Sequence, residues 1–209
     1  MKQYTHYISQ GSTPEDHLQN IETICRAGGT CIQLRLKDYS DDIVLETALK
    51  AQKICKTHQA IFIINDYVTI AKEIQTDGVH IGKTDMSPLE ARKLLGDTFI
   101  IGGTANTFED IEELNAARVD YIGLGPFRST TTKKNLSPLL HLSGYESISR
   151  KVIEAKITVP IVAIGGIQFD DIPLLAETAI SGIALSGLLT HAKEPALIIN
   201  YINHIFNER

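Results

Sequence analysis

The feature that most constrains the fold of this chain is a repeated alternation of short apolar runs with longer amphipathic stretches. Strands that are buried on both faces read as continuous apolar runs, and strands that alternate with helices form parallel sheets. Eight βα units in 209 residues favour an α/β fold with a single (β/α)8 (TIM) barrel. An open doubly wound sheet usually has fewer strands and a clear nucleotide fingerprint. The predicted strands are Tyr4–Ile8, Thr30–Leu34, Ile61–Ile64, Gly78–Ile81, Phe99–Gly102, Tyr121–Leu124, Ile161–Ile164 and Gly182–Leu185.

Helix-start signals agree with this alternation. Ser and Thr are favoured as N-caps, and Pro14 and Pro88 then occupy the first helical position, where a missing N–H costs little. No linker or further repeat interrupts the chain, so we expect residues 1–209 to form one catalytic barrel domain. The predicted helices are Pro14–Arg26 after Thr13, Asp41–Thr57 after Ser40, Pro88–Leu95 after Ser87, Phe108–Ala117 after Thr107, and Asp170–Glu177.

Composition narrows the class of partner. Hydrophobic residues make up 43% and charged residues 22% of the chain, as in ordinary globular proteins. The net charge of −5 gives no global attraction to nucleic acid or to an anionic membrane, so phosphate binding must be local. Cys25, Cys31 and Cys55 lack metal-binding spacing, and no export signal or membrane span is evident. We therefore expect a cytoplasmic protein without nucleic-acid or membrane partners; a homo-oligomer stays open.

The second predicted strand runs into Gln33-Leu34-Arg35-Leu36-Lys37. If the strand persists that far, alternation sends Gln33, Arg35 and Lys37 to one side. Arg presents a planar fork to phosphate oxygens and Lys a point charge, so the pair suits a diphosphate. A solvated strand end is the alternative for this segment taken alone.

Carboxylates follow the next two predicted strands, Asp66 in Asn65-Asp66 and Asp85 in Gly82-Lys83-Thr84-Asp85. Each alone is more typical of a loop or cap residue. Together, and beside Arg35 and Lys37, they suit Mg²⁺, which takes one or two protein carboxylates with phosphate oxygens and water. His80 lies among apolar residues and is interpreted as a packed core residue without a chemical role.

A second anion site is predicted at the later strands. The polar stretch from Gly125 to Gly144 carries Thr130, Thr131, Thr132 and Lys133, which favour phosphate ligation, although a flexible polar loop is the alternative. Gly165-Gly166 and Leu185-Ser186-Gly187 end the seventh and eighth strands, the usual phosphate position of such barrels. Two anion sites in one mouth imply two phosphorylated substrates, or one with phosphates at both ends.

Taken in order, these strand ends resemble the thiamine phosphate synthases, a family of (β/α)8 barrels. The resemblance implies a transferase that moves an aminopyrimidinylmethyl group from its diphosphate to the nitrogen of a thiazole phosphate, which gives thiamine phosphate and diphosphate. The segments that carry it are Gln33–Lys37, Asn65-Asp66, Gly78–Gly82 with Asp85, Gly123–Pro126 with Thr130–Lys133, Ala163–Ile167, and Leu185-Ser186.

The resemblance also implies roles for residues of this chain. Asp66 and Asp85 would hold Mg²⁺, and Arg35, Lys37 and Lys133 would act catalytically by neutralising the leaving diphosphate. The pyrimidine diphosphate would be bound by Gln33, Leu34, Arg35, Leu36, Lys37, Asn65, Thr104 and Lys133. The thiazole phosphate would be bound by Thr130, Thr131, Thr132, Gly166, Leu185 and Ser186.

Four positions depart from the family pattern, one of them Thr104, which stands where a Ser is common and keeps a hydroxyl. At the other three, Tyr67 stands where an Arg is frequent, Lys83 where a Gln is frequent and returns a charge nearby, and Asn106 where a His is frequent. Two alternatives remain. A thiazole tautomerase on the same barrel would tend to lack the cations and carboxylates and to keep that His. A non-catalytic barrel that binds a thiamine precursor would not need the metal ligands.

Overall fold

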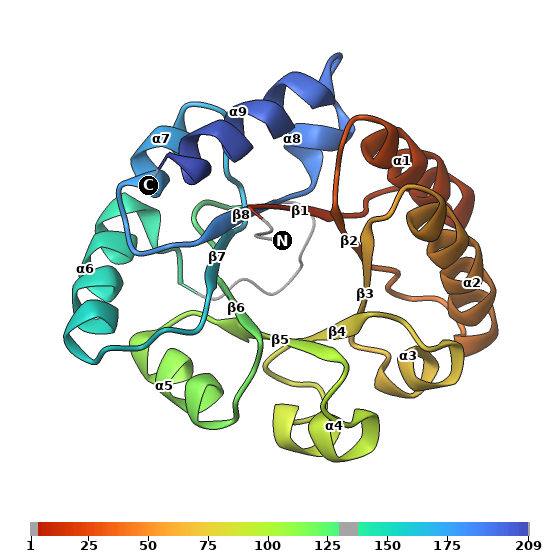
Figure 1. Ribbon diagram of the computed structural model, residues 1–209, viewed down its shortest axis with the longest axis horizontal. Helices are drawn as coiled ribbons and strands as arrows, with labels where there is room; N and C mark the ends of the chain where they lie inside the picture. The colour runs from red at the N-terminus through yellow and green to blue at the C-terminus, as the bar shows by residue number, and fades with distance from the viewer. Residues whose placement is uncertain (1–3, 130–137, 209) are drawn as a thin grey trace.

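The computed structural model describes residues 4–129 and 138–208. Within them, eight parallel strands close into a barrel in sequence order, and β8 pairs with β1 (Figure 1). The barrel predicted from the alternation is confirmed. The strands are β1 (Thr5–Ile8), β2 (Cys31–Leu34), β3 (Ile61–Asn65), β4 (Gly78–Ile81), β5 (Ile100–Ala105), β6 (Tyr121–Leu124), β7 (Ile161–Ile164) and β8 (Gly182–Leu185).

Helices surround the strands as an outer ring (Figure 1). The predicted Pro14–Arg26, Asp41–Thr57 and Pro88–Leu95 are found with the same bounds. The helices are α1 (Pro14–Arg26), α2 (Asp41–Thr57), α3 (Val68–Ile74), α4 (Pro88–Leu95), α5 (Phe108–Ala116), α6 (His141–Glu154), α7 (Asp171–Ala176), α8 (Gly187–Thr190) and α9 (Pro195–Asn207).

All four predicted N-cap residues occupy the N-cap position, and three of them cap the helix with their side chain. The side chains of Thr13, Ser87 and Thr107 each accept a backbone N–H of the first helical turn, and each belongs to a capping box. Ser40 is also at the N-cap position with extended backbone, as predicted, but its side chain makes no cap bond. Asp41 and Asp42 follow it and place negative charge in the first turn of α2, where the helix dipole favours it.

Apolar residues form two cores, one between the strands and the helices and a smaller one inside the barrel. The inner core consists of Ile8, Tyr121, Val162 and Ala184, with Ile100 and Ile164 packed against them. Glycines make room for the large inner side chains. A Cβ on Gly102 would lie 2.1 Å from Cζ of Tyr121, so only glycine fits beside this ring.

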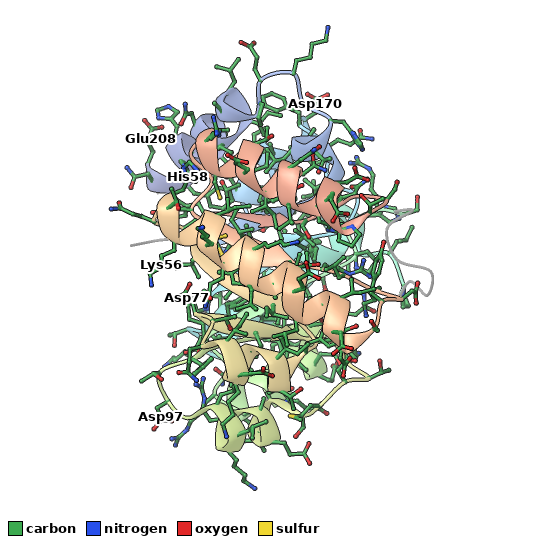
Figure 2. The ribbon with its side chains drawn as sticks, turned by 90° about the vertical axis from the view of Figure 1, so that its right-hand side faces the viewer. Lys56, His58, Asp77, Asp97, Asp170 and Glu208 are labelled. Atoms are coloured by element: carbon green, nitrogen blue, oxygen red, sulfur yellow. The ribbon has the colours of Figure 1, made fainter. Side chains whose placement is uncertain are left out.

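The connections between helices and strands identify the two ends of the barrel. Figure 2 shows Lys56, His58, Asp77 and Asp97 gathered at one end, on the left of that view. Lys56 lies in the last turn of α2, and His58, Asp77 and Asp97 lie in connections that lead from a helix to the next strand. The carboxyl ends of the strands therefore face the opposite end, where barrel enzymes place their active sites. No described helix is both long and apolar enough to cross a membrane.

Candidate functional site

The end of β2 separates its side chains as the alternation predicts. Leu34 and Leu36 are buried in the outer core, so a role for either in binding would fall to its backbone. Gln33 points the other way, and its Nε2 donates to Oδ1 of Asn65 on β3 at 2.6 Å. The strand ends at Leu34, but the Arg35 N–H still donates to Oγ of Ser9 at 3.0 Å. That bond holds the start of the segment that contains Arg35 and Lys37 against the end of β1.

Arg35 is a half-buried cation at this end of the barrel. Burial lowers the pKa of its guanidinium, and the negative charges of Asp66 and Asp38 oppose that shift. An arginine remains protonated at any physiological pH. Arg35 therefore supplies a permanent positive charge beside the carboxylates.

Asp66 follows β3 directly and turns back over the barrel. Its φ of 69° is left-handed, a conformation that Asp tolerates better than most residues. Its N–H donates to the carbonyl of His80 on β4 at 2.9 Å. Its Oδ2 lies 2.8 Å from Nζ of Lys37. The bend thus brings together a carboxylate from β3 and an ammonium from β2.

Asp85 approaches Asp66 from the loop after β4. A Cβ on Gly82 would lie 2.4 Å from Oδ2 of Asp85 and 3.7 Å from Oδ1 of Asp66, so both carboxylates converge over this glycine. Burial raises the pKa of Asp85, and the negative charge of Asp66 raises it further. Two carboxylates that crowd each other and still face solvent favour a cation between them.

The donor set around Gly82 suits a hard cation. Searched over the described residues, no group of three or more His, Cys, Asp or Glu side chains could hold a metal ion. Asp66 and Asp85 therefore offer only two carboxylates. Mg²⁺ fits such a pair when phosphate oxygens and water complete its octahedron, whereas structural Zn²⁺ requires four protein ligands.

Glycines shape the second predicted anion site. Gly165 and Gly166 after β7 have φ values of 92° and 68°. A Cβ on Gly166 would lie 2.8 Å from both Cβ of Arg128 and the carbonyl oxygen of Ser129. The glycines therefore let the loop after β6 approach the end of β7. The predicted ligands Thr130, Thr131, Thr132 and Lys133 follow Ser129 directly but lie outside the described residues.

The last predicted phosphate ligands follow β8. Leu185 is buried in the outer core, so only its backbone faces the mouth of the barrel. Ser186 is half-buried, and its Oγ donates to Oε1 of Gln10 at 3.1 Å. Gln10 follows β1, so this bond joins the two neighbouring strand ends.

Two of the residues that depart from the family pattern, Lys83 and Asn106, have side-chain partners in the structure. Lys83 lies 2.7 Å from Asp110, so its charge is paired at the start of α5 instead of being returned to the predicted diphosphate site. Nδ2 of buried Asn106 donates to the carbonyls of Gly125 and Pro138 at 3.0 and 2.9 Å. Asn106 thereby ties β5 to both described ends of the β6–α6 loop. That loop ends earlier than predicted, because α6 begins at His141.

One set of contacts inside the barrel was not predicted from the sequence. His80 is buried, as predicted, but its Nε2 lies 3.0 Å from Oγ1 of Thr104 and its Nδ1 lies 3.0 Å from the hydroxyl of Tyr121. Thr104 lies within β5, which extends beyond the predicted strand to Ala105. The sequence did contain a signal for these contacts. The strand that follows β4 is rich in glycine, so it leaves room beside an inward-facing His80.

A closed (β/α)8 barrel with cations and carboxylates at one group of strand ends, and glycine-rich ends opposite, defines a phosphate-handling barrel enzyme. A family model described as thiamine monophosphate synthase matches residues 6–189. A thiamine-phosphate synthase of Bacteroides fragilis is 49% identical over 90% of this chain and 93% of its own length. One from Phocaeicola vulgatus is 51% identical over 91% of this chain and 90% of its own.

The chain belongs to the thiamine monophosphate synthase family. The resemblance drawn from the strand ends, and the transferase class that it implies, are thereby confirmed. The structure of a thiamine phosphate pyrophosphorylase from Pyrococcus furiosus superposes with a TM-score of 0.82 at 23% identity, and covers 99% of this chain and 96% of that one. At that identity the superposition supports the fold alone.

Proposed function

We propose that the mouth of this barrel joins the two halves of thiamine phosphate. An aminopyrimidinylmethyl group would pass from its diphosphate to the ring nitrogen of a thiazole phosphate, with diphosphate as the leaving group. The contact that carries the proposal is the 2.8 Å pair of Lys37 and Asp66, with Asp85 converging on Asp66 over Gly82. Mixed charge of this kind suits a polyanion that arrives with a divalent cation.

The chain's own residues would act mainly on the leaving group. The carbon–oxygen bond breaks as the ring amino group stabilises the positive charge that develops on the carbon. The negative charge that develops on the diphosphate would meet Arg35, whose backbone N–H is held by Ser9, and Lys37, whose ammonium is held by Asp66. The thiazole nitrogen attacks with its lone pair, so no general base is required.

Asp66 and Asp85 would hold the metal ion, and Mg²⁺ is the ion that two carboxylates and phosphate oxygens fit best. When bound, it would supply further positive charge to the leaving group. Gln33, Asn65 and Thr104 would bind the pyrimidine diphosphate together with the backbone of Leu34 and Leu36. Gly166, Ser186 and the backbone of Leu185 would bind the thiazole phosphate. We assign Thr130, Thr131 and Thr132 to the same phosphate and Lys133 to the pyrimidine diphosphate.

Two further features of the chain belong to this proposal. We propose that residues 1–209 work as one catalytic domain, since the closed barrel uses strands from both ends of the chain. We also propose a cytoplasmic setting. Cys25, Cys31 and Cys55 are buried as free thiols, which suits a reducing compartment.

The test is to mix the purified full chain with both substrates and Mg²⁺ and to separate the products by chromatography. We expect thiamine phosphate and diphosphate in equal amounts. Asp66→Ala should abolish the coupling and leave thiazole phosphate binding, measured by calorimetry, within about twofold of the unaltered chain. Undiminished turnover by this variant would show that the metal assignment is wrong.

The thiazole tautomerase alternative is less well supported. The cations and carboxylates that a tautomerase does not need are present in the sequence, and Lys37 forms an ion pair with Asp66. Asn106, which cannot act as an acid or base, binds two carbonyls instead. Incubation with the thiazole precursor alone separates the two functions, because a tautomerase would isomerise it without any pyrimidine substrate. A precursor-binding barrel would form no product in either assay.

A further inference from the structure

Three neighbouring strands place polar side chains together inside the barrel. Gly102 on β5 is the register partner of both His80 on β4 and Tyr121 on β6. Because Gly102 has no side chain, the His80 and Tyr121 rings meet across it, with centroids 5.4 Å apart. Thr104, two residues further along β5, is the register partner of Gly123. A Cβ on Gly123 would lie 3.1 Å from Cε1 of His80, so this glycine also leaves room for the imidazole.

Hydrogen bonds join the three side chains in a row. Tyr121 Oη lies 3.0 Å from Nδ1 of His80, and Nε2 of His80 lies 3.0 Å from Oγ1 of Thr104. Tyr121 and His80 are 7% and 6% exposed, whereas Thr104 is half-buried toward the mouth. The row therefore leads from the interior of the barrel to a side chain of the proposed substrate site.

The chemistry of the three groups gives the row a direction. Burial raises the pKa of Tyr121 well above its usual range, so the phenol keeps its proton. An imidazole nitrogen accepts a hydrogen bond better than a phenol oxygen does, so Tyr121 donates to Nδ1. With Tyr121 as the donor, a neutral His80 would carry its proton on Nε2 and donate to Oγ1 of Thr104. With that oxygen accepting from His80, the Thr104 hydroxyl is left to donate its own proton elsewhere.

We propose that Tyr121 and His80 are positioning residues that commit the Thr104 hydroxyl to donate a hydrogen bond to a ring nitrogen of the pyrimidine substrate. The inference rests on the proposed function and adds how the ring is recognised. Arg35 and Lys37 supply the charged donors that suit the diphosphate, so a neutral donor suits the neutral ring. A hydroxyl with a fixed donor role also discriminates against a ring atom that cannot accept.

The first experiment measures the KM for the pyrimidine diphosphate in a double-mutant cycle. Tyr121→Phe removes only the hydroxyl and should raise this KM about fivefold, the loss expected for one neutral hydrogen bond. Thr104→Ala should raise it by at least as much. The double variant should be no worse than Thr104→Ala alone, because Tyr121 acts only through Thr104. The KM for the thiazole phosphate should not change in any of the three.

Tyr7→Phe is the matched control. Tyr7 is also buried, and its hydroxyl lies 2.8 Å from Oγ1 of Thr190 outside the barrel. The variant loses a tyrosine hydroxyl and its side-chain partner but leaves the row intact. It should lower stability without raising the KM for the pyrimidine diphosphate. Thr104→Ser, which keeps the hydroxyl, should retain sensitivity to Tyr121→Phe.

Two measurements do not depend on the folding of these variants. Nitrogen NMR of the unaltered chain without substrate should show His80 protonated on Nε2 and not on Nδ1. A substrate analogue with C–H in place of that ring nitrogen should bind the unaltered chain about fivefold more weakly. A proton on Nδ1, undiminished binding of the analogue, or additive effects of the two substitutions would each overturn the proposal. Failure of the unaltered chain to form thiamine phosphate would instead contradict the proposed function.

Discussion

Nζ of Lys37 lies 2.8 Å from Oδ2 of Asp66, although the two residues follow different strands of the barrel. The Lys37 side chain is 47% exposed and that of Asp66 16%. A pair this accessible to solvent contributes little to folding stability, typically about 0–1 kcal/mol. We interpret the pair as charged groups that are positioned to bind substrate. Removal of either partner should therefore affect activity far more than stability.

Lys37→Gln tests this expectation. The variant loses one of the cations that face the leaving diphosphate, so we expect kcat to fall by roughly 10²–10³. The free energy of unfolding, from urea titration, should change by less than about 1 kcal/mol. Lys50→Gln is the control, because Lys50 forms a 2.7 Å pair with Glu46 on the exposed face of α2. Equal losses of activity in both variants would contradict a specific role for Lys37.

Asp85→Asn should weaken the metal site. The variant keeps the shape of the side chain but removes one of the two charges that converge over Gly82. We expect the Mg²⁺ concentration for half-maximal activity to rise by about tenfold or more, with activity partly restored at high Mg²⁺. Asp97→Asn is the control, since Asp97 lies at the opposite end of the barrel (Figure 2). Unchanged Mg²⁺ dependence in Asp85→Asn would remove Asp85 from the site.

Gly166→Ala should impair thiazole phosphate binding. Its φ of 68° disfavours alanine, and the added Cβ would lie 2.8 Å from Arg128 and Ser129. We expect the KM for thiazole phosphate to rise and stability to fall by about 1–3 kcal/mol. Gly28→Ala shares the positive φ, 94°, but its Cβ would meet nothing within 4 Å. Gly28→Ala should therefore lose stability through backbone strain alone and keep its KM.

His17 makes stability depend on pH. Its Nδ1 lies 2.7 Å from Oγ of buried Ser9, and burial lowers its pKa below the ordinary 6.5. The folded protein then binds fewer protons than the unfolded chain once the pH falls below that value, so stability decreases on acidification. His17→Gln should flatten this part of the profile, as measured by urea unfolding between about pH 7.5 and about pH 5.5. An unchanged slope would assign the effect to other groups.

Local signals in the sequence determined the barrel and much of the location of its site. Eight apolar runs mark the strands because a strand covered on both faces excludes polar side chains. Thr13, Ser87 and Thr107 mark helix starts because a cap needs only the backbone of the next few residues. Parallel strands send all their carboxyl ends to one rim, so the residues that follow each run could be assigned to one mouth.

Only the tertiary structure decided which of those residues meet. Lys83 was expected to add charge near the diphosphate, but it pairs with Asp110, and His80 joins Thr104 to Tyr121. Such contacts depend on the register between neighbouring strands and on glycines such as Gly102, whose missing side chain matters only to its neighbours across the sheet. Register comes from the packing of the whole closed barrel. A pattern read along one strand contains no information about which residue lies beside it on the next.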